Sequence, residues 1–213
     1  MFIFLQKLKV INQNQRGFTL LEINFAIGIF LIIIMGIFAL FNVSSKANRD
    51  VWESSNTQGE ASKAVQTFVD ELRTANYSSI GGYPLTFATG TEIIFYSNID
   101  TDVLVERVRY FIEGNILKKG VTKPAGDILY SYNTSTEQII ELAHNLKTPV
   151  GTVFTYYGES YNGASNTSSM PYPIVLPDVR IIQMRLLLKQ NSAINAITFE
   201  VQTKVQLRNL KTN

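Results

Sequence analysis

A long apolar run over residues 23–45 constrains this chain more than any other feature. It holds 23 uncharged residues, mostly Ile, Leu, Phe and Ala, and Glu22 is the only charged residue between Phe18 and Ser45. An α-helix rises about 1.5 Å per residue, so the run extends roughly 35 Å and can cross a hydrocarbon layer of about 30 Å. Soluble helices of this length usually keep a polar face. We therefore predict a membrane-spanning helix, with a buried helix of a soluble protein as the alternative.

Positive charge is concentrated before this run. Residues 1–17 carry Lys7, Lys9 and Arg16 and no acidic residue, whereas the whole chain of 213 residues has a formal net charge of +2. Subtracting the +3 of this segment leaves −1 for residues 18–213, which gives no strong signal for nucleic-acid binding. Hydrophobic residues make up 46% of the chain and charged residues 17%, a balance that excludes disorder as the main state. We expect the basic segment to remain on the cytoplasmic side of the membrane.

Several kinds of chemistry are excluded by composition. The chain has no cysteine and a single histidine, His144. Disulfides, a thiolate nucleophile and a zinc site of the cysteine type are therefore impossible, and a catalytic pair of imidazoles is too. Ser160 lies between Gly158 and Gly163, but the spacing differs from the Gly-x-Ser-x-Gly nucleophile turn. We expect no enzymatic activity and no cofactor.

The junction between the basic segment and the apolar run has a specific pattern. It reads Arg16-Gly17-Phe18-Thr19-Leu20-Leu21-Glu22. This string resembles the prepilin cleavage and methylation signal of type IV pilins and type II secretion pseudopilins. Four elements match together: a basic leader, a glycine before the cut, a phenylalanine after it, and a glutamate as the fifth residue of the mature chain. The resemblance covers residues 1 to about 45.

The resemblance implies a role for each residue at the junction. Prepilin peptidase would cleave after Gly17, and the new amine of Phe18 would be methylated. The carboxylate of Glu22 would pair with the N-terminal amine of a neighbouring subunit, and Thr19 would assist by hydrogen bonding in the same region. On physical grounds, a carboxylate in an apolar helix costs several kcal/mol unless it is neutralised or paired. The alternative for Glu22 is a carboxylate at the membrane interface with no part in assembly.

Beyond the run, an amphipathic helix is expected to continue. One apolar face has helical spacing, and we predict that it packs on a domain: Ala61, Ala64, Val65, Phe68, Val69 and Leu72. The helix should end within residues 76–82, where Ser78, Ser79, Gly81 and Gly82 interrupt the helical pattern. Trp52 is expected to be buried or to contact another subunit. The predicted organisation is a prepilin leader (1–17), a transmembrane and assembly helix (18–45), its amphipathic continuation (46–78) and a globular antiparallel β domain (79–213).

The pattern after residue 83 favours strands. Candidates are residues 92–97, 103–112, 115–121, 127–132 and 150–157, with two more strands at the end of the chain. In the last strand, Phe199, Val201 and Val205 alternate with polar residues, which indicates one buried face. Residues 135–145 are predicted to form a short helix, because Ser135 and Gln138 have the spacing of a capping box. The fold class is therefore α+β, a long N-terminal helix packed on an antiparallel β domain with two sheets.

Two loops suggest binding. Asn98, Asp100 and Asp102 alternate as oxygen ligands do in calcium loops, and Glu106 could join them only if the chain turned back. A polar turn without metal is the alternative, and it is the interpretation we adopt from sequence. The loop 158–173 is long and polar, with tyrosines at both ends, which suits a partner surface or a tolerated insertion.

The resemblance implies a structural subunit of a filament. The expected protein is a minor pilin or pseudopilin of a type IV pilus or type II secretion pseudopilus, similar in size to the larger W and J types. Its expected partners are prepilin peptidase, other pilin or pseudopilin subunits and the inner membrane, with the globular domain outside the cytoplasm. The alternative is a membrane-anchored adhesive or ligand-binding domain that does not enter a filament.

Overall fold

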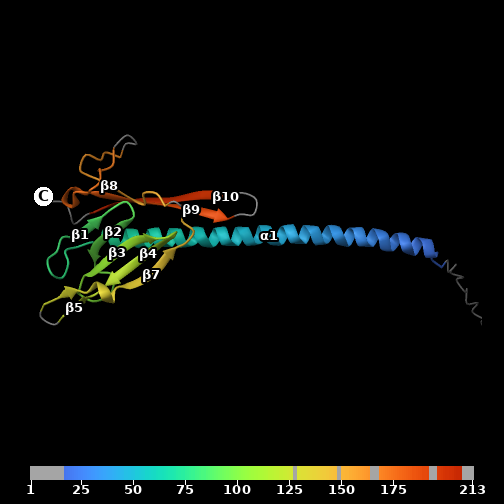
Figure 1. Ribbon diagram of the computed structural model, residues 1–213, viewed down its shortest axis with the longest axis horizontal. Helices are drawn as coiled ribbons and strands as arrows, with labels where there is room; N and C mark the ends of the chain where they lie inside the picture. The colour runs from blue at the N-terminus through green and yellow to red at the C-terminus, as the bar shows by residue number, and fades with distance from the viewer. Residues whose placement is uncertain (1–16, 127–128, 148–149, 164–167, 192–195, 208–213) are drawn as a thin grey trace, which may run out of the picture. The chain divides into compact units, whose positions relative to one another are not determined.

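The computed structural model describes residues 17–126, 129–147, 150–163, 168–191 and 196–207. The chain divides into two compact units, Met1–Ala47 and Asn48–Asn213. A single α-helix among these described residues, α1 (Leu20–Arg73), contributes to both units, and the remaining elements belong to the second unit (Figure 1). This arrangement confirms the predicted α+β class.

The described part of the second unit forms two main antiparallel sheets. The larger has five strands in the order β1-β2-β3-β4-β7. Its strands are β1 (Leu85–Ala88), β2 (Glu92–Ser97), β3 (Glu106–Glu113), β4 (Ile116–Thr122) and β7 (Gln138–Ala143). Because β1 to β4 are consecutive in the chain, each can pair with its neighbour through a short connection. The predicted strand 92–97 is confirmed, whereas the strand predicted to begin at residue 103 begins at Glu106.

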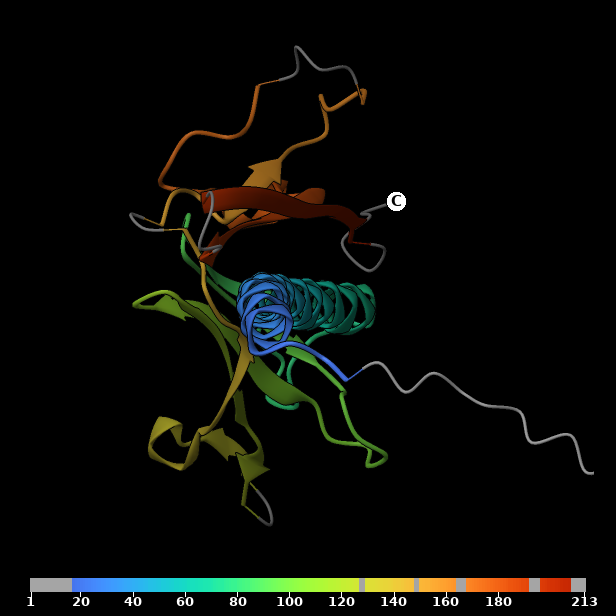
Figure 2. The same ribbon diagram turned by 90° about the vertical axis from the view of Figure 1, so that its right-hand side faces the viewer.

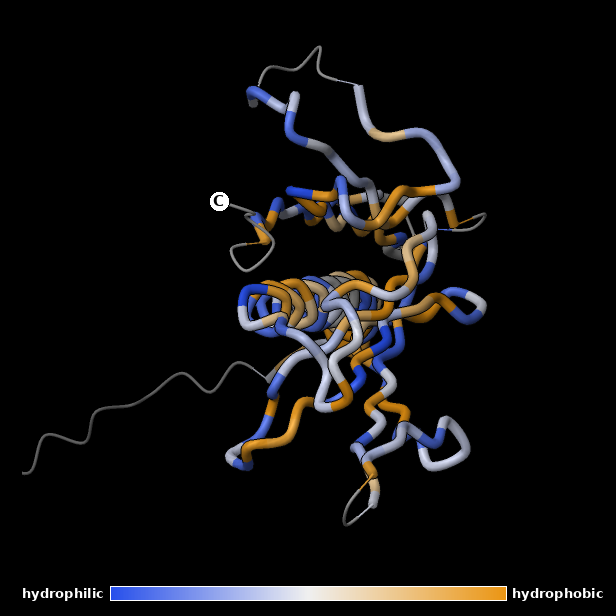
Figure 3. The backbone as a smooth tube through the Cα atoms, turned by 90° about the vertical axis from the view of Figure 1, so that its left-hand side faces the viewer, coloured by the Kyte–Doolittle hydropathy of each residue, from blue (hydrophilic) through white to orange (hydrophobic). Residues whose placement is uncertain are grey.

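The smaller sheet has three strands in the order β10-β9-β8. They are β8 (Phe154–Tyr157), β9 (Ile181–Asn191) and β10 (Ala196–Gln206). A two-stranded pair, β5 (Pro124–Ala125) and β6 (Ser131–Tyr132), and two 3-10 turns, η1 (Thr134–Thr136) and η2 (Leu176–Asp178), lie in the connections. Hydrophobic and hydrophilic residues are interspersed along the backbone of the β domain (Figure 3). In β10 the alternation is the predicted one, with Val205 buried and Lys204 exposed.

The C-terminal part of α1 lies between the two sheets (Figure 2). All six residues of its predicted apolar face are buried. The fully buried ring of Phe68 contacts aromatic rings from both sheets: its centroid is 5.1 Å from Tyr110 on β3, 6.3 Å from Phe95 on β2 and 5.8 Å from Phe154 on β8. The helix therefore supplies the centre of a core that neither sheet could close alone, since an apolar sheet face needs a covering layer.

A buried ion pair joins the same helix to the larger sheet. The Lys119 ammonium on β4 contacts Oε1 of Glu71, and the Tyr110 hydroxyl donates a hydrogen bond of 2.6 Å to Oε2 of Glu71. Burial is the main cause that raises the pKa of Tyr110 above its usual range, so its hydroxyl stays protonated as a donor. The glutamate is thus held from two strands.

The helix ends at Arg73, before the predicted limits of 76–82. Contacts with strand β2 explain why the helix ends at Arg73. The Ser97 hydroxyl donates to the carbonyl of Glu71 at 2.8 Å, and its oxygen lies 2.8 Å from the Thr74 hydroxyl. Ala75 then forms a β-bridge with Ser97. Because β2 satisfies groups that the next helical turn would otherwise use, the chain leaves the helix here.

The short helix predicted for residues 135–145 is wrong. The capping signal belongs to Asn133, whose side chain accepts from the Ser135 N–H at 3.0 Å and starts only the single turn η1. The chain then forms β7, the edge strand paired with β4. Ile139 and Ile140 are adjacent β-branched residues, each 51% exposed, so no helical apolar face is buried. Pairing with the free edge of β4 satisfies the backbone, and this pairing outweighs the local helix signal.

Candidate functional site

The junction motif forms the start of α1. Gly17, Phe18 and Thr19 precede the helix, which begins at Leu20. The Thr19 hydroxyl oxygen accepts a hydrogen bond from the Glu22 backbone N–H at 3.3 Å, and the Thr19 carbonyl accepts from Ile23 N–H at 3.2 Å. Thr19 is therefore the N-cap residue. Its spacing to Glu22 is that of a capping box, a signal that could have been read from the sequence.

Glu22 lies in the first turn of the helix with its side chain exposed. The unpaired N–H groups at a helix N-terminus carry partial positive charge, which favours a carboxylate at this position. Within the described residues, Glu22 makes no ion pair. Its carboxylate can therefore receive a positive group from outside the chain without breaking an existing contact.

The helix following this motif presents an apolar surface on all sides. Within Leu20–Arg49, an 18-residue window has a mean hydropathy of 2.7 and no buried residue. Among the described residues, this is the one helix that is long and apolar enough to cross a membrane. Two polar side chains in this span are satisfied locally. The Asn24 amide donates to the Leu20 carbonyl at 3.1 Å, and the Asn42 amide donates to the Phe38 carbonyl at 2.9 Å. Such internal bonding is what a hydrocarbon environment requires.

A shallow groove runs along this apolar surface beside the motif. It is lined by Phe18, Glu22, Ile23, Ala26, Ile27 and Phe30. A second groove nearby includes Gly28, whose missing side chain leaves open space around its backbone. Grooves between side-chain ridges are the features that receive the ridges of another helix. The surface can therefore accept helices as well as lipid chains.

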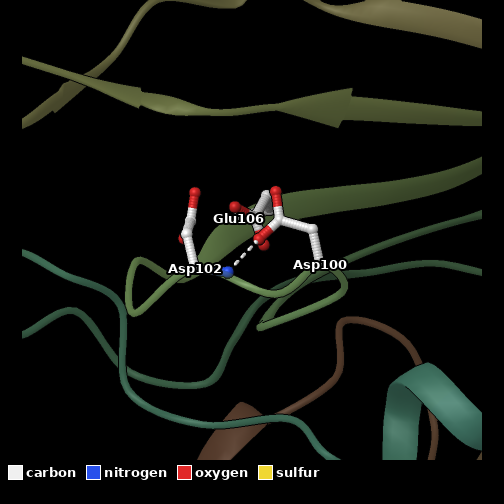
Figure 4. A group of neighbouring side chains, drawn as sticks. All are labelled: Asp100, Asp102 and Glu106. Carbon is white, nitrogen blue, oxygen red and sulfur yellow. Dashed lines mark hydrogen bonds between the residues drawn. The ribbon is translucent and has the colours of Figure 1, made fainter.

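The alternating acidic residues of the β2–β3 loop gather with Glu106 at the start of β3 (Figure 4). One carboxylate oxygen from each of Asp100, Asp102 and Glu106 lies within 4.8 Å of the others. Asn98 is not a member of this group, because its amide donates to the Asp102 carbonyl at 2.6 Å and shapes the loop. The chain thus makes the turn that adding Glu106 required. Burial is the largest cause that raises the pKa of the Glu106 carboxyl.

The tyrosines around the loop 158–173 point mainly toward their own domain. Tyr156, one of the tyrosines at the start of this loop for which the sequence suggests a partner surface, is fully buried, and its hydroxyl donates to the Thr89 carbonyl at 2.9 Å, so the suggestion is wrong for this residue. The Tyr172 hydroxyl donates to the Phe154 carbonyl at 2.8 Å, although half of this residue is exposed. The ring centroids of Tyr157 and Tyr161 lie 4.6 Å apart. These contacts fasten both ends of the described loop to the smaller sheet.

Histidine and tryptophan occupy different settings. His144 follows strand β7, and its two ring nitrogens lie 3.0 Å from carboxylate oxygens of Glu60 and Glu141. The hydrogen bond with Glu60, followed by that with Glu141, raises the pKa of His144. Trp52 is 70% exposed, so the predicted burial is wrong and a subunit contact stays a prediction.

Comparison with known proteins identifies the junction. Residues 12–38 match the family model described as the prokaryotic N-terminal methylation motif, while the chain has no significant match among curated protein sequences. The matched residues include the N-cap, Glu22 and the first half of the exposed apolar helix. The chain thus carries a prepilin-type N-terminal methylation motif, and the resemblance of this segment to type IV pilins and type II secretion pseudopilins is confirmed.

Proposed function

We propose that the chain is a minor pilin or pseudopilin, a structural subunit of a type IV pilus or a type II secretion pseudopilus. The observation that carries the proposal is a methylation motif placed at the capped start of a fully exposed apolar helix. The same helix ends as the central core element of a β domain. A secretion signal is removed from the mature protein, so we would not expect its helix to continue into that core.

Processing is the first step of the proposed function. Gly17 lies outside the helix, is exposed, and has open space where a side chain would project. A membrane peptidase that binds the backbone can therefore reach the peptide bond between Gly17 and Phe18. Cleavage would leave Phe18 as the only residue before the N-cap Thr19, with its amine available for methylation.

Assembly is the second step, and it follows from the charges that cleavage leaves. The new amine of Phe18 would lie at the positive end of α1, where the helix dipole disfavours another positive charge. Glu22 would remain an exposed carboxylate in an apolar layer. Pairing this carboxylate with the amine of a neighbouring subunit neutralises both groups, and such pairing fixes the axial register between two helices. The groove beside Phe18 and Glu22 gives the neighbouring helix a place to pack.

Location follows from charge asymmetry. With Lys7, Lys9 and Arg16 held on the cytoplasmic side, the helix crosses the inner membrane once and the β domain lies outside the cytoplasm. Trp52 lies just beyond the apolar span Leu20–Arg49, where aromatic side chains favour the membrane interface. The subunit would later leave the membrane for the filament. The competing function is an adhesive or ligand-binding domain that stays anchored in the membrane.

Gly17→Val tests the processing step. In cells with a prepilin peptidase, the wild-type chain should mature to a species that begins at methylated Phe18, as measured by intact-mass spectrometry. Gly17→Val should remain at precursor mass, because a β-branched side chain would meet the peptidase at the bond to be cut. Retention of residues 1–17 by the wild-type chain would refute the proposal.

Glu22→Leu tests assembly and separates the two functions. This variant should insert in the membrane as well as the wild type, because a charge has been removed from an apolar helix. Its amount in sheared filament fractions should fall sharply. Asn24→Leu is the matched control, since the Asn24 amide bonds only within its own turn among the described residues, and this variant should assemble normally. Equal incorporation of Glu22→Leu and Asn24→Leu would favour the anchored domain.

A further inference from the structure

The β2–β3 loop concentrates three carboxylates in one place. Asp100 and Asp102 come from the loop, Glu106 begins β3, and all three side chains converge (Figure 4). Oxygen atoms on opposite sides of a Ca²⁺ ion bound at about 2.4 Å lie about 4.8 Å apart. The oxygens of this group, which lie within 4.8 Å of one another, are therefore already within the distance that one such ion would span.

Each of the three carboxylates uses one oxygen to bind the loop backbone. Asp100 Oδ1 accepts from the Asp102 N–H at 3.0 Å, and Asp102 Oδ1 accepts from the Leu104 N–H at 2.7 Å. Glu106 Oε2 accepts from the Ile99 N–H at 3.1 Å. These bonds hold the three side chains in place and leave the second oxygen of each available to a cation.

The Lys123 ammonium lies beside these second oxygens, but it does not contact all of them. Its ammonium contacts Asp100 Oδ2 and lies 4.0 Å from Asp102 Oδ2. Glu106 is fully buried, and its Oε1 has no hydrogen-bond partner among the described residues. A buried carboxylate oxygen without a partner is costly, so this atom indicates a missing ligand at the cluster.

We propose that Asp100, Asp102 and Glu106 bind a Ca²⁺ ion, which displaces Lys123. Once Lys123 has turned away, the three carboxylates carry a charge of −3 when all are ionised, and a divalent ion compensates more of this charge than a single ammonium does. The Lys123 side chain is 62% exposed, so it can turn into solvent. Asp102, with 47% of its side chain exposed, leaves room for waters to complete the six to eight oxygen ligands that Ca²⁺ takes. Mg²⁺ fits less well, because it demands near-octahedral geometry and short bonds.

The experiment titrates CaCl₂ into the purified full-length chain in detergent micelles, followed by isothermal calorimetry. We expect one site with a Kd of about 10⁻⁴ to 10⁻³ M, as in extracellular calcium modules. Saturating Ca²⁺ should also raise the Tm of the β domain by roughly 5 °C, since the ion binds only the folded state. Lys123→Met should bind Ca²⁺ about tenfold more tightly, because the competing charge is gone.

Glu106→Gln should abolish binding, and Glu113→Gln is its matched control. Glu113 ends the same strand and pairs with Lys118 outside the cluster, so this variant should bind Ca²⁺ as the wild type does. If Glu106→Gln fails to fold, Asp102→Asn gives the same test at an exposed position and should weaken binding at least tenfold. The proposal is overturned if neither the wild type nor Lys123→Met gives a heat of Ca²⁺ binding. Unchanged binding by the cluster variants, or equal affinity for MgCl₂, would overturn it as well.

Discussion

Phe68→Ala should unfold the β domain far more readily than any change on its surface. The Phe68 side chain is fully buried, and its ring contacts Phe95, Tyr110 and Phe154, which belong to two different sheets. Truncation of a buried phenylalanine costs about 3–5 kcal/mol, with the larger values at sites that cannot collapse. Strands held by ladder hydrogen bonds cannot move inward from both sides of α1. We therefore expect a loss of about 4 kcal/mol.

The assay is thermal unfolding of the full-length chain in detergent, followed by near-UV circular dichroism. This signal reports tertiary packing around aromatic residues, so helix that persists in the micelle does not obscure it. A loss of about 4 kcal/mol should lower the Tm by roughly 8–16 °C for a domain of this size. Phe68→Asp should lower it further, because an unpaired charge would enter the core.

Phe87→Ala is the matched control for this measurement. Phe87 lies on β1 and is 43% exposed, so its removal should change the Tm by only a few degrees. If Phe68→Ala and Phe87→Ala shift the Tm equally, α1 does not form the centre of the core and our account of the fold is refuted.

Three further predictions concern the second unit. Lys119→Met should destabilise the domain by about 3 kcal/mol or more, because it leaves Glu71 buried without its cation, and Lys119→Met combined with Glu71→Leu should recover part of this loss in thermal unfolding. The raised pKa of His144 means that its pairs with two carboxylates stabilise the fold fully below about pH 6.5, the unfolded value, and that this contribution disappears as the pH rises through the higher folded value. His144→Gln should therefore reduce the difference in unfolding free energy between pH 5.5 and pH 8.5, measured by thermal unfolding, by less than about 1 kcal/mol, because the site is partly exposed. A chain that starts at Asn48 should be soluble, folded and monomeric by size-exclusion chromatography, because the compact unit begins there; aggregation of this chain would contradict the separation of the two units.

Local patterns predicted the parts of this fold that depend on local chemistry. The apolar span and the buried face around Phe68 follow from composition and helical spacing, and both are present. The contact between Glu71 and Lys119 joins residues 48 positions apart, so no local pattern reveals it. The failure at β7 has the same cause, because Ile139 and Ile140 suit either state and the deciding partner is β4.

The candidate sites divide in the same way. The motif from Gly17 to Glu22 is contiguous, so it could be identified completely from the sequence. The cluster of Asp100, Asp102 and Glu106 could be predicted from the sequence only in part. Whether Glu106 joined Asp100 and Asp102 depended on the turn of the chain, and the competition from Lys123 depended on where the connection between β4 and β5 lies. The burial of Tyr156 was equally hidden, since its partner Thr89 is 67 residues away.

The contacts between the β domain and the C-terminal part of α1 allow only one axial position of the helix. If the helix slid by one turn, Ala64 or Leu72 would occupy the space of the Phe68 ring, and Thr67 or Ala75 would face the Lys119 ammonium in place of Glu71. The first exchange mismatches the volume of the pocket, and the second leaves a buried charge alone. A force applied along the helix axis therefore loads the core contacts and the ion pair at the same time, in shear. We expect the domain to unfold before the helix slides relative to it.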